Sequence, residues 1–179
     1  ENLKQLLATT ELADLGPRTR AGTLSPEVLN VRLDSLFASS STPKRIQDLV
    51  RGAVLLWHDH LDAAHGIAQE IDDADGSLLH GIMHRREPDY GNAKYWYRRA
   101  GRHPCFPELA QQTKALLGPG QAALAARLAP GGTWDAFAFI DACEDAAHHR
   151  NVGAAVPVLQ EIQRVEFQVF IESLCSRLG

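Results

Sequence analysis

Residues 78–101, LLHGIMHRREPDYGNAKYWYRRAG, decide the fold of this chain. Apolar and small residues recur every three or four positions on both sides of Pro88, and this spacing is typical of amphipathic helices. Because proline lacks an N–H and restricts the residue before it, Pro88 belongs between two helices rather than inside one. The stretch therefore predicts a helical hairpin, with one helix over residues 77–87 and the next over residues 89–100.

The same periodicity continues along most of the chain. Further helices are expected over residues 26–37, from residue 43 to about 57, and over 61–71, 106–117, 121–128, 133–149 and 155–178. The connecting segments DDADG, GRHPC, GPG and APGG have the residues that turns prefer. No segment alternates with period two for long enough to predict a strand. The sequence thus predicts an N-terminal arm and loop (residues 1–24) and a single all-α, multi-helix domain (25–179) with repeat-like antiparallel hairpins and a long, buried C-terminal helix.

Composition limits the classes of function. The chain has 179 residues, of which 45% are hydrophobic and 22% charged, as is usual for a globular domain. The net charge of −4 does not favour a nucleic-acid partner. No apolar run reaches the roughly 18 residues of a membrane span, so no membrane partner is expected. The three cysteines are odd in number and far apart, which predicts free thiols and a cytoplasmic location.

Charge is unevenly distributed along the chain. Residues 52–84 contain acidic side chains but no Lys or Arg, whereas residues 85–102 are mainly basic. A basic stripe at Lys94, Arg98 and Arg102 would lie along one face of a helix. Two interpretations are open: adjacent helices pair their charges at the surface, or the basic face binds an anionic small molecule or an acidic peptide.

The chain also contains a weak internal repeat. Residues 51–71 align without gaps on residues 80–100, so that Gly52 falls on Gly81 and Ala64 on Ala93. Such self-similarity is typical of stacked helical hairpins. The alignment places a bend near His58. The alternative is one long helix over residues 43–71, which would weaken the repeat.

The second copy resembles a tetratricopeptide or Sel1-type repeat, and the resemblance covers residues 51–104. The positions that carry it are Gly81, Tyr90, Ala93, Tyr97, Ala100 and Pro104. In such repeats the small residues allow close approach of two helices and the aromatic residues fill the space between them, so the resemblance implies stacked hairpins. One departure is His84, which stands where the repeat usually has a buried aromatic residue. The wider stretch 57–104 also resembles a family of helical bacterial and fungal proteins, and that resemblance implies no activity.

Three polar side chains in HGIMHRRE have the spacing of metal ligands. His80, His84 and Glu87 lie at i, i+4 and i+7, within one stripe of a helix. Imidazole and carboxylate groups projecting from the helices of a bundle are how metal sites are built in such folds, and they suit a divalent transition metal. The same spacing recurs in two further triads, His58–Asp62–His65 and Asp141–Asp145–His148. The alternatives are a hydrogen-bonded pair of histidines in the core and histidines at a surface or partner contact.

These features lead to one principal hypothesis and two alternatives. The principal hypothesis is a ligand- or partner-binding module whose polar concavity is lined by Trp57, His58, His84, Arg85, Arg86, Glu87, Trp96 and Arg99. The first alternative is a metal-dependent enzyme or redox protein that uses His80, His84 and Glu87. The second is a purely structural interaction domain. No nucleophile motif or phosphate-binding loop is present, so the sequence assigns no catalytic residue.

Overall fold

The computed structural model describes residues 3–148 and 156–176, and every regular element in these ranges is helical. The α-helices are α1 (Leu3–Leu6), α2 (Pro26–Phe37), α3 (Lys44–Trp57), α4 (Leu61–Ala68), α5 (Ala74–Arg86), α6 (Tyr90–Ala100), α7 (Phe106–Leu117), α8 (Ala122–Leu128), α9 (Ala136–Ala147) and α10 (Val156–Ser176). Single 3-10 turns occur at Pro119–Gln121 and Pro130–Gly132. The all-α prediction is confirmed. None of these helices combines the length and the apolar character needed to cross a membrane.

Helix positions agree with the periodicity, and the differences lie at helix ends. The helix expected from residue 133 begins at Ala136, because the Asp135 side chain accepts a hydrogen bond from the Ala138 N–H at 2.9 Å and so caps the helix there. Helix α5 begins earlier than expected, at Ala74, because Asp73 caps it through the N–H groups of Asp75 and Gly76. The expected ends at residues 149, 155 and 178 lie outside the described residues.

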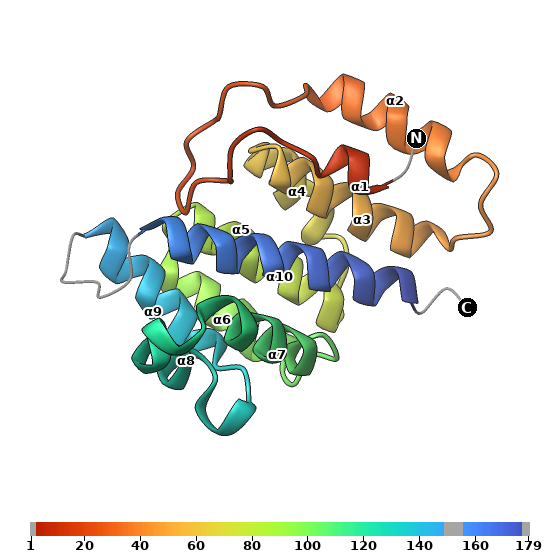
Figure 1. The fold of residues 1–179 in the computed structure, drawn as a ribbon. Coiled ribbons are helices and arrows are strands. Elements are labelled where there is room, and N and C mark those ends of the chain that lie inside the picture. Colours follow the sequence, from red (N-terminus) through yellow and green to blue (C-terminus); the bar gives the residue numbers. More distant parts are fainter. Residues whose placement is uncertain (1–2, 149–155, 177–179) are drawn as a thin grey trace.

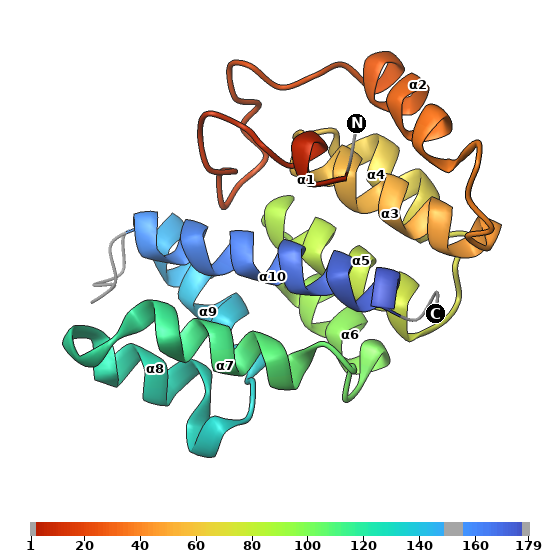
Figure 2. The same cartoon turned by 45° about the vertical axis from the view of Figure 1, so that its right-hand side comes forward.

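The long C-terminal helix α10 crosses the middle of the molecule. Helices α1–α4 lie on one side of it and α6–α9 on the other, with α5 behind (Figures 1 and 2). Its apolar side chains are buried against both sides, including Leu159, Ile162, Phe170 and Leu174. The prediction of a long, buried C-terminal helix is therefore confirmed, and this helix joins the two halves of the bundle.

The first half contains two consecutive helical hairpins, α3 with α4 and α5 with α6. Residues 43–71 are therefore not one helix, because α3 ends at Trp57 and α4 begins at Leu61. Asp59 in the bend has a φ of 69°, in the left-handed region that Asp tolerates better than most residues. The bend removes His58 from the helix, so the triad His58–Asp62–His65 does not form.

Two glycines explain how closely the hairpin helices approach. A methyl group placed on Gly81 of α5 would lie 2.5 Å from Cδ2 of Tyr97 in α6. A methyl group on Gly52 of α3 would lie 2.7 Å from Cδ2 of Leu79 and 3.3 Å from Cγ2 of Ile67 in α4. Both glycines thus sit where another helix packs on the backbone, as their alignment in the repeat implies.

A buried ionic network joins α5, α6 and α10. The guanidinium of Arg85 donates to both carboxylate oxygens of Glu166, at 3.0 and 2.5 Å, and neither side chain is exposed. Arg85 also donates to the Tyr97 hydroxyl at 2.8 Å, and this hydroxyl donates to Glu166 at 2.5 Å. Burial opposes the charge on Arg85, but Glu166 outweighs it and raises the pKa of Arg85. Burial raises the pKa of Tyr97 well above its ordinary value, which keeps its hydroxyl protonated as a donor.

A second buried network holds the N-terminal arm. The carboxylate of Asp59 accepts hydrogen bonds from Arg20 Nε at 2.9 Å and from Arg86 Nη2 at 2.8 Å. Arg86 also donates to the carbonyl oxygens of Leu56 at 2.5 Å and Gly16 at 3.2 Å. Burial alone would raise the pKa of Asp59, but the two arginines lower it, so the carboxylate is charged at neutral pH. The arm also places Leu6, Ala13 and Leu15 in the apolar core, so both polar and apolar contacts attach it to the bundle.

Removing Arg85 alone should destabilise the fold strongly. Arg85→Met leaves the carboxylate of Glu166 buried without its cation, and loss of one member of a buried ion pair typically costs about 3–5 kcal/mol. The double variant Arg85→Met, Glu166→Gln should recover a substantial part of this loss, because no uncompensated charge remains. Urea unfolding of the single and double variants measures both the loss of stability in Arg85→Met and its recovery in the double variant. A double variant as unstable as the sum of its single changes would contradict this account of the network.

Candidate metal centre

Three histidines from two neighbouring helices converge at one place. His65 comes from α4, and His80 and His84 come from α5, one helical turn apart. One ring nitrogen from each lies within 4.8 Å of the other two, and among the described residues this is the group of three ligand-type side chains with metal-binding proximity. His80 and His84 are 3% and 5% exposed, whereas His65 is partly exposed. The cluster therefore has a buried side and an open side.

The imidazole rings are held by stacking. His80 lies between two parallel rings, with its centroid 3.9 Å from that of Trp96 and 4.8 Å from that of His84. His65 meets both histidines edge-on, at 4.7 and 5.3 Å between centroids. Because Trp96 comes from α6, the α5–α6 hairpin provides two of the three histidines, His80 and His84, together with the aromatic ring on which His80 stacks.

Glu87 contacts His84 rather than completing the group of three. Its Oε2 lies 2.9 Å from Nδ1 of His84, and the amide of Asn92 lies 3.1 Å from Nε2 of the same ring. A carboxylate bonded to one ring nitrogen fixes the orientation of the imidazole and makes it a better ligand through the other nitrogen. The structure thus places Glu87 where it can position His84, and it places His65 as the third nearby imidazole.

The environment favours the neutral form of His80 and His84. Burial, together with the neighbouring His84 and His65, lowers the pKa of His80 to about 4. Burial also lowers the pKa of His84, although the Glu87 carboxylate opposes this effect. Nδ1 of His80 is buried and has no hydrogen-bond partner in the described structure. Histidine binds metal ions in its neutral form, and a metal ion at His84 would replace one of the two hydrogen bonds of that ring.

Four of the eight residues expected to line a polar concavity lie at or beside the histidines. These are His84, Glu87, Trp96 and Arg99. The guanidinium of Arg99 lies 5.2 Å from the Trp96 ring centroid and pairs with Asp72. This ion pair, together with that of Arg86 and Asp59, shows that the basic and acidic segments do pair across helices.

The other four residues lie elsewhere and have structural contacts. Arg85 and Arg86 point into the two buried networks described above. Trp57 packs edge-on against Phe167, with 5.4 Å between centroids. His58 accepts a hydrogen bond from the Leu24 N–H at Nδ1, so its Nε2 carries the proton that bonds the Leu6 carbonyl at 2.7 Å. These contacts of the four side chains are thus with residues other than the three clustered histidines.

The triad Asp141–Asp145–His148 has separate partners instead of a common site. Asp141 pairs with Lys94, and Asp145 pairs with Arg127 at 3.1 Å. Nδ1 of His148 lies 2.9 Å from the Glu144 carbonyl, and His148 is exposed. Of the basic stripe, Lys94 is thus engaged with α9, and Arg98 lies over the Phe137 ring of α9 at 5.5 Å.

His65 is the member of the site that local spacing does not reveal. Helical spacing compares residues within one helix, and it linked His65 only to His58 and Asp62. The packing of α4 against α5 instead brings His65 to His80 and His84. The alignment of the two hairpins related their packing positions to one another, but it did not indicate which side chains would meet as ligands.

The donor set fits a transition metal ion of the zinc type. Three neutral imidazoles leave a fourth tetrahedral position for water or a ligand, as in catalytic zinc sites. Zinc–nitrogen bonds of about 2.0–2.1 Å would place tetrahedral ligands about 3.4 Å apart, so the nitrogens must approach by roughly 1.4 Å. Side-chain rotation of the partly exposed His65 can supply much of this movement.

The chain matches no family model, and neither curated proteins nor solved structures show significant similarity to it. Assignment of a function therefore depends on the geometry of the chain itself.

Acidification should loosen the N-terminal arm. Burial lowers the pKa of His58, and protonation at Nδ1 would remove the acceptor that the Leu24 N–H uses. A histidine with a lower pKa in the folded state binds fewer protons there, so stability is constant above pH of about 6.5 and falls as the pH drops below it. His80 lowers the stability in the same direction, as the pH falls from about 6.5 to its own pKa of about 4.

Urea unfolding at pH 7.5 and pH 5.0 in the absence of metal measures this effect. His58→Gln should be less stable than the unmodified protein at pH 7.5 but should lose less stability between the two pH values. The exposed His148 provides the control, because His148→Gln should keep the original pH dependence. An unchanged pH dependence in His58→Gln would exclude His58 as a contributor.

Proposed function

We propose that this protein binds a divalent transition metal ion through the imidazoles of His65, His80 and His84. The observation that carries this proposal is the approach of three ligand nitrogens to within 4.8 Å of one another, from two helices of a rigid hairpin pair. Two supporting features are the depressed pKa of His80 and the contact of Glu87 with His84. Nδ1 of His80 is also buried without a hydrogen-bond partner among the described residues, whereas the ring nitrogens of a histidine in an ordinary core are usually hydrogen-bonded.

The chemistry available at such a site follows from its open position. A bound metal ion supplies Lewis acidity and lowers the pKa of a coordinated water. The chain contributes the orientation of His84 by Glu87, the stacking of His80 on Trp96, and a cation beside the site, Arg99. This arrangement agrees with a metal-dependent enzyme that acts on a small substrate.

An anionic ligand fits the same site. Arg99 is paired with Asp72, but the two side chains are 42% and 83% exposed, and an ion pair this exposed contributes little energy. A carboxylate or phosphate that binds the metal could therefore displace Asp72 and accept two parallel hydrogen bonds from the guanidinium of Arg99. In this proposal the binding function expected from the sequence and the metal site are parts of one centre.

The hairpin architecture serves the site as a scaffold. The two hairpins, with Gly52 and Gly81 at their close contacts, support the resemblance to a Sel1-type repeat over residues 51–104. In this proposal His84 departs from the repeat pattern because it contributes a ligand where a repeat would have a packing aromatic residue.

Metal binding is tested directly by titration of the full chain with Zn²⁺ and Co²⁺. We expect one equivalent to bind, to raise the melting temperature, and to give the visible absorption of tetrahedral Co²⁺. His65→Ala and His84→Ala should abolish these signals. Glu87→Gln should keep the site but lower its affinity by about 10–100-fold, the usual effect of losing a carboxylate that orients a ligand.

The matched control is His148→Ala, which removes an exposed histidine on α9 and should bind metal as the unmodified protein does. Circular dichroism of each variant verifies that the helices are intact. If the unmodified protein binds no more Zn²⁺ than His65→Ala, the three histidines form a packing cluster and the proposal fails.

A further inference from the structure

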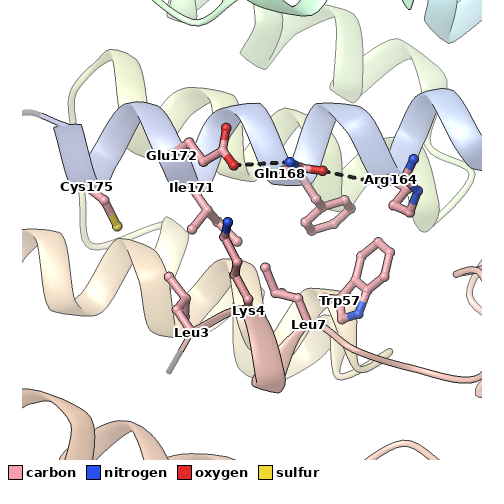
Figure 3. Close-up of a pocket in the computed structure, with 10 residues that line it drawn as sticks. Leu3, Lys4, Leu7, Trp57, Arg164, Gln168, Ile171, Glu172 and Cys175 are labelled. Carbon is pink, nitrogen blue, oxygen red and sulfur yellow. Dashed lines mark hydrogen bonds between the residues drawn. The ribbon is translucent and has the colours of Figure 1, made fainter. Parts of the chain in front are cut away.

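A pocket unrelated to the histidine site lies between α1, α3 and α10. Its volume is about 670 Å³, within the range of small-molecule sites. Figure 3 shows its lining, with Leu3 and Lys4 from α1, and Leu7 directly after it, facing the side chains of α10. The residues that line it are Leu3, Lys4, Leu7, Trp57, Arg164, Phe167, Gln168, Ile171, Glu172 and Cys175.

The pocket is long and mainly apolar. It follows α10 from Arg164 to Cys175, a distance of about 16 Å at the rise of an α-helix. Its walls are the aliphatic side chains of α1 and α10 and, at one end, the Trp57 and Phe167 rings. Both aromatic residues are buried, at 3% and 1% exposed, whereas Lys4 and Cys175 at the other end are exposed. The pocket therefore has buried aromatic rings at the Trp57 end, where the partly exposed Arg164 also lines it, and is open at the Cys175 end.

The polar groups at the rim of the pocket differ in their hydrogen-bond and ion-pair partners. Along α10, Arg164 bonds Glu161 and Gln168, and the neutral amide of Gln168 donates to Glu172, which has no cation partner among the described residues. Lys4 has no hydrogen-bond or ion-pair partner among the described residues, and its side chain extends from α1 toward α10 (Figure 3). Lys4 is thus the cation available to an anionic ligand at this rim, which Glu172 also lines.

We propose that this pocket binds a linear monocarboxylate of medium chain length. The hydrocarbon chain lies along α10 between Leu7 and Ile171, with its end against Trp57 and Phe167, and the carboxylate is paired with Lys4. An extended chain fits the long, narrow apolar space, and one anionic group matches the one unpaired cation. The site does not involve the histidine cluster and does not depend on the proposed metal function.

Calorimetric titration of the full chain with hexanoate, octanoate, decanoate and dodecanoate tests the apolar part of the proposal. Affinity should rise about fourfold with each added methylene, the value expected when that group leaves water. Leu7→Trp places a larger side chain in the pocket, from the residue directly after the short helix α1, and should lower the affinity for decanoate at least tenfold. A wild-type protein that binds none of these acids saturably would overturn the proposal.

The head group is tested by comparing decanoate with decanol. Lys4→Ala should weaken the binding of decanoate and leave that of decanol unchanged, whereas Lys114→Ala, which removes an exposed lysine of α7, should change neither. His65→Ala should bind decanoate normally, which separates this site from the metal centre. Equal effects of Lys4→Ala on both ligands would overturn the assignment of the carboxylate. The oligomeric state of the chain separates one further possibility. If the chain forms a dimer that Leu7→Trp dissociates and decanoate does not, the pocket is a contact between two copies of the chain, and the proposal is wrong.

Discussion

The bidentate pair between Arg85 and Glu166 is the contact on which the arrangement of the helices most depends. It lies with both side chains fully buried between α5 and α10, and Tyr97 extends it to α6. A charge in this position is tolerated only if its partner is present with good geometry, so the pair restricts how α10 can sit on the hairpin. Apolar contacts supply most of the burial along α10, but they are less directional than this pair.

The same constraint separates the functions of adjacent residues in HRRE. Successive side chains on α5 point in different directions, because a helix rotates about 100° per residue. Arg85 therefore faces α10, Arg86 faces the N-terminal arm, and His84 faces α4 and His65. One short motif holds the central helix, the arm and the proposed metal centre. A substitution here affects stability and the site together, so variants of His65 in α4 distinguish the two more clearly.

The two proposed sites occupy different parts of this framework. The histidine centre lies on the α4–α5–α6 side and uses rings held by stacking, whereas the apolar pocket lies between α1 and α10. The short helix α1 covers the pocket and its Leu6 is anchored by His58. Protonation of His58 at Nδ1 keeps the bond from Nε2 to the Leu6 carbonyl and removes only the contact with the Leu24 N–H, so acid acts on the arm at Leu24 rather than at the pocket.

Helix content, the α5–α6 hairpin and the buried C-terminal helix followed from the sequence, because periodicity, prolines and capping residues act over a few positions. His80 and His84 could be found for the same reason, since they share a stripe of one helix. Tertiary structure alone decided three other features. It brought His65 to the other two histidines, buried the side chains of Arg85 and Arg86, and gave Trp57 and His58 partners away from the site. These contacts join residues up to 81 positions apart, as Arg85 and Glu166 are. Local spacing carries no information about which helices pack together, and only their packing decides whether a polar side chain meets a partner in the core, a ligand or water.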